Sequence, residues 1–255
     1  MYTILVILAL FSGAHTACRD TNFQYCSVDL AQRLGIDSNL SSQLFKNYTI
    51  LYQNFLYQYG QTPGSTVDMV TVCNALETFK LCMYNDRDCL DISSLVARTD
   101  VINAYLVHGT LAQYTFNCGP GVNTLIHEGL ECPQRVMANY RNTLNACVET
   151  YKSSITHDVD NGCTYVENLV KCWSAPFRQA NCRNEDGADL WWACESNRVF
   201  TNEMFSKCRY HCDIKKGGFQ TDEYLEEHYK ASHGSKFLIT LIPLTDVSKK
   251  SKALG

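Results

Sequence analysis

Several common sequence features are absent from this chain of 255 residues, and each absence excludes a class of protein. No apolar run approaches the roughly 20 residues that a membrane-spanning helix needs. Its 22 basic residues are outnumbered by 26 acidic ones and form no cluster, whereas a nucleic-acid-binding protein needs a basic face to neutralise phosphates. No G-x-S-x-G motif supplies a serine nucleophile, and no Cys-x2-Cys pair marks a zinc site. We therefore expect neither a transmembrane segment nor nucleic-acid binding, and no cofactor.

The first 17 residues, MYTILVILALFSGAHTA, have the layout of a secretory signal peptide. A short apolar run from Ile4 to Phe11 is followed by small residues, and cleavage after either Ala14 or Ala17 fits this pattern. Two N-glycosylation sequons, at Asn39 and Asn47, are also typical of an exported protein. We therefore expect a secreted, extracellular glycoprotein.

Cysteine is abundant, with fourteen residues. They are Cys18, Cys26, Cys73, Cys82, Cys89, Cys118, Cys132, Cys147, Cys163, Cys172, Cys182, Cys194, Cys208 and Cys212. Either cleavage site leaves all fourteen in the mature chain, and an even number can form seven disulfides in an oxidising compartment. This count leaves no thiol to act as a catalytic nucleophile.

Apolar residues recur at steps of three and four along most of the chain, which predicts an all-α fold. Predicted helices cover 40–59, 66–84, 99–116, 133–151, 164–173, 188–196 and 201–211. We expect residues 18–212 to form a cysteine-rich helical domain. The cysteine-free region 213–255 is expected to add a helix and, at the apolar stretch 237–244, a docking strand or extended arm. Within this region, Lys215-Lys216 is a candidate processing site.

The spacing of the cysteines restricts their pairing. Residues nine apart on a helix are turned by about 900° and lie roughly 13.5 Å apart along the axis, whereas disulfide-bonded α-carbons lie within roughly 7 Å. Cys73 therefore cannot bond Cys82, and Cys163 cannot bond Cys172. Each of these helices is expected to be tied on both sides to different neighbours, which gives a disulfide-braced bundle.

Two further patterns concern the arrangement of the cysteines. The stretches CNALETFKLC (73–82) and CTYVENLVKC (163–172) share a spacing, and Cys118–Cys132 has the same separation as Cys194–Cys208. These coincidences, which involve five cysteines in each half, predict two repeat units, 68–147 and 158–212. On a helix over 201–211, Cys208 and Cys212 would share a face and bridge to the same neighbouring region.

Three groups of residues are candidates for chemistry or binding. Cys208, His211 and Cys212 could supply zinc ligands from one helical turn, but paired cysteines would rule this out. The glycine-rich 117–121 followed by His127-Glu128 resembles the calcium loop and histidine of secreted phospholipases, although the spacing is too short. The adjacent Trp191 and Trp192 point about 100° apart on a helix, so one of them could form an exposed binding surface.

The segments CNALETFKLC, FNCGPG and LWWACESNRVFTNEMFSKC together resemble a family of secreted cysteine-rich helical proteins abundant in nematodes. The nearest named group is the chondroitin proteoglycan 4-like domain family and its uncharacterised relatives. This resemblance covers roughly Cys73 to Cys212 and implies an extracellular, non-enzymatic protein. Ser12-Gly13, the only Ser-Gly pair, lies in the leader, so chondroitin attachment is not supported for this chain.

The sequence therefore predicts a secreted, non-enzymatic interaction or matrix-type protein with an extracellular protein or glycan partner. One alternative is a carrier of a small apolar ligand or lipid between the helices. A second alternative is a calcium-dependent lipid hydrolase.

Overall fold

The computed structural model describes residues 18–123, 130–180 and 188–208, together with Tyr210 and Cys212. These residues form an all-α bundle without strands, which confirms the predicted fold class. The leader 1–17, the arm 237–244 and the pair His127-Glu128 lie outside the described residues. The α-helices are α1 (Asp20–Arg33), α2 (Tyr48–Tyr59), α3 (Val67–Cys82), α4 (Ile92–Val96), α5 (Val101–Asn117), α7 (Glu131–Asn139), α8 (Arg141–His157), α9 (Gly162–Gln179) and α10 (Ala188–Asn202), and the 3-10 helices are η1 (Ser38–Gln43) and η2 (Arg87–Leu90).

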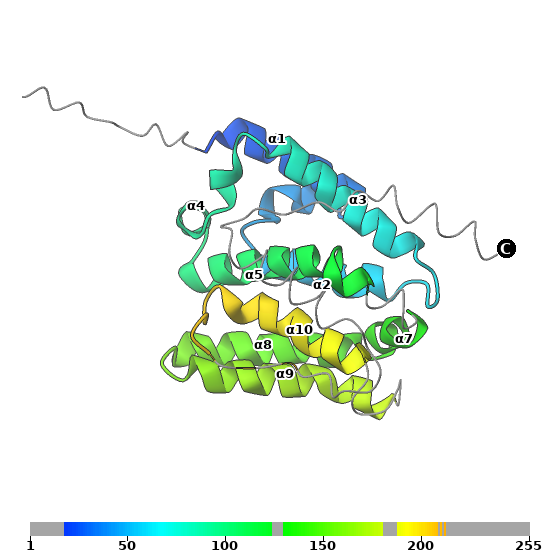
Figure 1. Ribbon diagram of the computed structural model, residues 1–255. Helices are drawn as coiled ribbons and strands as arrows, with labels where there is room; N and C mark the ends of the chain where they lie inside the picture. The colour runs from blue at the N-terminus through cyan, green and yellow to red at the C-terminus, as the bar shows by residue number, and fades with distance from the viewer. Residues whose placement is uncertain (1–17, 124–129, 181–187, 209, 211, 213–255) are drawn as a thin grey trace, which may run out of the picture.

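The helices are arranged in layers (Figure 1). Helices α1 and α3 lie side by side at one face, α2 and α5 occupy the middle, and α8, α9 and α10 form the opposite side. Helix α2 contributes many of the fully buried aromatic side chains, including Tyr48, Tyr52, Phe55 and Tyr59. No described helix is both long and apolar enough to cross a membrane.

Disulfides brace this bundle between helices. The six whose partners are both described are Cys18–Cys89, Cys26–Cys82, Cys73–Cys118, Cys147–Cys172, Cys163–Cys208 and Cys194–Cys212. On α3, Cys73 is bonded to Cys118 at the end of α5, while Cys82 is bonded to Cys26 on α1. The expectation that a Cys-x8-Cys helix is tied to two different neighbours is thus confirmed.

The same connectivity occurs twice along the chain. Cys163 on α9 is bonded 45 residues onward to Cys208, as Cys73 on α3 is bonded 45 residues onward to Cys118. Cys172 on α9 is bonded back to the preceding helix α8, as Cys82 on α3 is bonded back to α1. A repeat is therefore present in the bonding pattern, but its units differ from the predicted 68–147 and 158–212. The bonding matches Cys118 with Cys208, whereas the predicted units matched Cys118 with Cys194.

The contact between α5 and α10 joins the two repeats. Gly109 on α5 makes it possible, because a Cβ atom built there would lie 2.0 Å from the carbonyl oxygen of Phe200 on α10. Further along, Gln113 Nε2 and Asn117 Nδ2 donate hydrogen bonds of 3.0 and 3.2 Å to Ser196 Oγ. These three polar side chains are fully buried. Since a buried polar group is costly unless paired, they fix how the two helices align.

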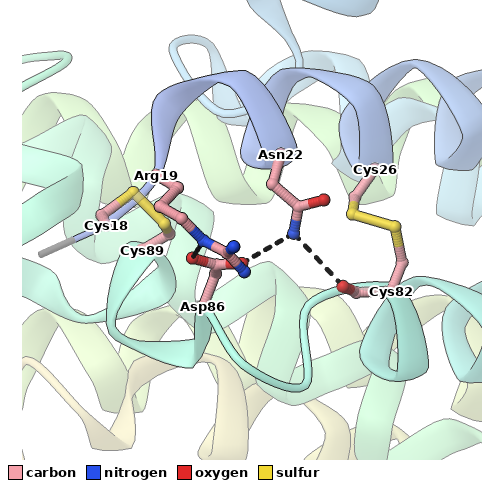
Figure 2. A network of polar contacts seen from close by, with 7 residues as sticks. All are labelled: Cys18, Arg19, Asn22, Cys26, Cys82, Asp86 and Cys89. Atoms are coloured by element: carbon pink, nitrogen blue, oxygen red, sulfur yellow. Dashed lines mark hydrogen bonds and ion pairs between the residues drawn. A yellow bond between two sulfur atoms is a disulfide. The ribbon is translucent and has the colours of Figure 1, made fainter. Parts of the chain in front are cut away.

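A polar network ties the start of α1 to the end of α3 (Figure 2). The carboxylate of Asp86, only 1% exposed, accepts hydrogen bonds from Arg19 Nε at 2.8 Å, Arg19 Nη2 at 2.6 Å and Asn22 Nδ2 at 2.7 Å. The hydrogen bond from Arg19 is the main cause that lowers the pKa of Asp86 to about 2. The network lies between the disulfides Cys18–Cys89 and Cys26–Cys82, so two disulfides and an ion pair hold α1 against the end of α3.

Two predicted helices are divided in the structure. The helix predicted over 40–59 is replaced by η1 and α2, which are separated at Asn47. The Asn47 side chain caps α2 by accepting from Thr49 N at 3.1 Å, and its extended backbone cannot continue a helix. The helix predicted over 133–151 is interrupted at Tyr140, between α7, which packs on α2, and α8, which packs on α9.

The predicted helix 201–211 is also wrong. Helix α10 ends at Asn202, and the chain then turns so that the Phe205 ring lies against Gly162 at the start of α9. Cys208 and Cys212 consequently do not share a helical face. Their bonds lead to different helices, to Cys163 on α9 and to Cys194 on α10.

Candidate functional site

An open groove of about 510 Å³ lies at one end of the bundle and is the candidate functional site. Three segments that are far apart in the sequence form its walls: the start of α5, the end of α8 with the following turn, and the chain after α10. The lining residues are Val101, Ile102, Tyr105, Ile155, Thr156, His157, Val159, Met204 and Phe205. Most of these side chains are apolar, and Val101 and Val159 are each 51% exposed.

Local interactions fix each wall. Asp100 caps α5 by accepting a hydrogen bond from Asn103 N at 2.9 Å. In the turn after α8, the carboxylate of Asp158 accepts hydrogen bonds from Asn161 Nδ2 at 2.5 Å and from Asp160 N at 3.1 Å. The third wall is anchored by the disulfide between Cys208 and Cys163, next to the contact of Phe205 with Gly162. Each wall of the groove is therefore held by contacts of its own.

In the sequence, a carboxylate stands directly next to a lining residue of every wall of the groove. Asp100 precedes Val101, Asp158 and Asp160 enclose Val159, and Glu203 precedes Met204. Hydrogen bonding, chiefly from Asn161, lowers the pKa of Asp158, so this group is ionised at neutral pH. On the positive side, the nearest lysine that follows Met204 in the sequence is Lys207. An apolar floor with negative flanks favours an apolar ligand that carries positive charge at its ends.

The chemical candidates from the sequence do not come together in the described residues. Cys208 and Cys212 are disulfide-bonded and so cannot act as thiolate ligands, while their companion His211 lies outside the described residues. Among the residues described, no group of three or more His, Cys, Asp or Glu side chains could hold a metal ion. Each of the thirteen described cysteines is disulfide-bonded, including Cys132.

His108 is a buried histidine that the sequence analysis did not single out. It lies on α5 and is 3% exposed. Burial lowers its pKa, while the negative charges of Glu203 and Asp91 act in the opposite direction. His108 follows the groove-lining residue Tyr105 on α5, but His108 itself does not line the groove.

The two adjacent tryptophans are placed differently. Trp192 is fully buried and packs against Trp173, with ring centroids 5.9 Å apart. It therefore cannot contribute to a binding surface. Trp191 is half-buried and packs against Phe116, with ring centroids 5.8 Å apart. Neither tryptophan lines the groove.

Both sequon asparagines are accessible. Asn39 lies in η1 and Asn47 at the start of α2, and both side chains are exposed. The Asn47 side-chain oxygen caps the helix by accepting hydrogen bonds from Thr49 N and Thr49 Oγ1, and the cap does not use the amide nitrogen, to which a glycan would be attached. Both positions are sterically suited to carry a glycan.

One cavity inside the described bundle is too small for a ligand. A cavity between α1, α2, α3 and α5 has a volume of about 10 Å³. This is at the lower limit of the space that one water molecule needs. This cavity therefore cannot hold the apolar ligand of the carrier alternative.

Comparisons with known proteins found no relative: no family model, no curated protein and no solved structure matches the chain.

Proposed function

We propose that this protein is exported, N-glycosylated and non-enzymatic, and that it acts outside the cell by binding another protein through the apolar groove. The observation that carries the proposal is the complete pairing of the described cysteines. Disulfides on this scale persist in oxidising compartments and are rare in the cytosol. The leader-like segment 1–17 and the exposed Asn39 and Asn47 support the same compartment.

The groove supports a protein partner better than a glycan partner. Its lining offers few side-chain hydrogen-bonding groups, namely those of Tyr105, Thr156 and His157, whereas a sugar needs many. An exposed concave apolar surface is typical of a site for protein–protein contact. The flanking carboxylates favour an apolar segment of the partner with basic residues on either side.

The compartment is tested by producing the full chain in a eukaryotic secretory host. We expect the protein in the medium, a decrease in mass after N-glycosidase treatment, and no reaction of the denatured, unreduced chain with a thiol reagent. An N39Q/N47Q double variant should show no mass decrease. Retention in the cell with free thiols would contradict the proposal.

The same secreted material separates the alternative functions. Native mass spectrometry that detects a co-purifying lipid would favour the carrier. Calcium-dependent ester hydrolysis that is lost in a His127→Ala variant would favour the lipid hydrolase. Absence of both, together with a partner crosslinked at the groove, supports the interaction protein.

A further inference from the structure

The apolar lining and the neighbouring carboxylates of the groove indicate what kind of segment would bind there. Its exposed valines would be covered by an apolar segment, and the carboxylates at Asp100, Asp158, Asp160 and Glu203 would attract basic residues at the ends of that segment. A segment of about eight extended residues spans at most roughly 26–29 Å.

The chain itself contains such a segment. The stretch FLITLIPL at 237–244 is apolar, is preceded by Lys236 and is followed by Lys249, Lys250 and Lys252. Asp246 is the only acidic residue between Lys236 and Lys252. We propose that the groove binds this C-terminal segment of the same chain, which lies outside the described residues, and that the protein thereby covers its own recognition site.

The connection to the groove is long enough. Cys212, the last described residue, is held by its disulfide beside Cys194 on α10, and the helix rises by about 12 Å from Cys194 to its end at Asn202. The 24 residues from 213 to 236 can span at most roughly 80 Å. The segment therefore reaches the groove without strain.

Tethering also makes a weak contact sufficient. A segment on a flexible linker is present at an effective concentration on the order of 1 mM. An intrinsic dissociation constant about ten times below this value would keep the groove occupied for most of the time. Cleavage after Lys215-Lys216 would abolish this advantage and open the groove to a segment of another protein.

Photo-crosslinking within the full chain tests this inference. A benzophenone amino acid replaces Leu241, and the crosslinked peptides are identified by mass spectrometry. We expect crosslinks within a single chain to residues 101–105, 155–159 and 204–205, with a yield that decreases as salt screens the lysines. The V101K/V159K variant should decrease this yield about tenfold, because it places positive charge on two groove side chains that are each 51% exposed.

The control is a V67K/V70K variant on α3, where the two valines are 66% and 43% exposed and lie outside the groove. It adds the same charge and should leave the crosslinks unchanged. Crosslinks that join two chains would show that a second copy is the occupant and would overturn the inference. Crosslinks elsewhere, or none, would overturn it as well.

The inference shares the groove with the proposed function, and a second measurement distinguishes their failures. A labelled peptide of residues 236–252 is added to a full-length variant with Leu238→Asp and Leu241→Asp. If the peptide binds and V101K/V159K prevents binding although no crosslink formed within the chain, the groove recognises such segments but is not covered by its own. If the peptide does not bind either, the groove does not recognise this segment, and only a partner protein crosslinked at the groove tests the proposed function.

Discussion

Replacing Gly109 with alanine is expected to destabilise the protein through one atomic contact. The added Cβ would lie 2.0 Å from the Phe200 carbonyl oxygen and 3.1 Å from its carbonyl carbon, so α5 and α10 would have to move apart by about 1 Å. Overpacking costs about 1–3 kcal/mol, and a backbone clash belongs at the upper end of this range. Alanine is favoured over glycine inside a helix by about 1 kcal/mol. The free energy of unfolding should therefore decrease by about 2 kcal/mol.

Urea unfolding of the oxidised protein, followed by far-UV circular dichroism, measures this change. With a slope of about 2 kcal/mol per molar urea, the midpoint should decrease by about 1 M. Gly119→Ala is the matched control, because the nearest atom to its new Cβ is the Thr115 carbonyl oxygen at 3.3 Å, which requires only a small adjustment. A Gly109→Ala midpoint equal to or above that of the unchanged protein would refute the close approach of the two helices.

Three further outcomes are expected. Arg19 lowers the folded-state pKa of Asp86 to about 2, below its unfolded value near 4. The stability that Asp86 contributes is therefore complete above pH 4 and is lost as the pH falls toward 2. The Asp86→Asn variant should lose this pH dependence of stability between about pH 4 and 2, as measured by urea unfolding at each pH. Trp191→Phe should remove most of the acrylamide-quenchable fluorescence, since the other two tryptophans are buried, and unchanged quenching would contradict their placement. Peptide mapping without reduction should find Cys132 bonded to Cys182, which corresponds to Cys18–Cys89 in the repeat.

Local periodicity was sufficient to predict the fold class and one restriction on the disulfides. The apolar steps of three and four follow the buried faces of the helices, and the geometry of residues nine apart excluded Cys73–Cys82 and Cys163–Cys172 without knowledge of any neighbour. Both inferences depend on the α-helix alone.

The helix boundaries that were mispredicted depend on packing. Apolar spacing continues through Asn47 and Tyr140 because the segments on both sides bury a face, although they pack on different helices. At Asn47 a signal was available, since Asn-x-Thr is both a sequon and a helix cap. The offset of the repeat could not be predicted, because equal spacings do not reveal which cysteines lie close together.

The groove could not be predicted from the sequence either. Its walls come from segments near residues 101, 157 and 204, and none of these stretches carries a motif. The available signal was the placement of Val101 and Val159 beside aspartates, where an apolar side chain is left exposed. An exposed valine indicates a binding groove only when the structure shows other apolar side chains beside it.

The repeated bonding pattern has a consequence for biosynthesis. All six cysteines up to Cys118 are bonded to one another, so none of them waits for a later partner. The first half of the chain can therefore complete its oxidation while the second half is still being translated. It follows that a single proteolytic cut between Cys118 and Cys132 would leave two fragments that separate on a denaturing gel without reductant.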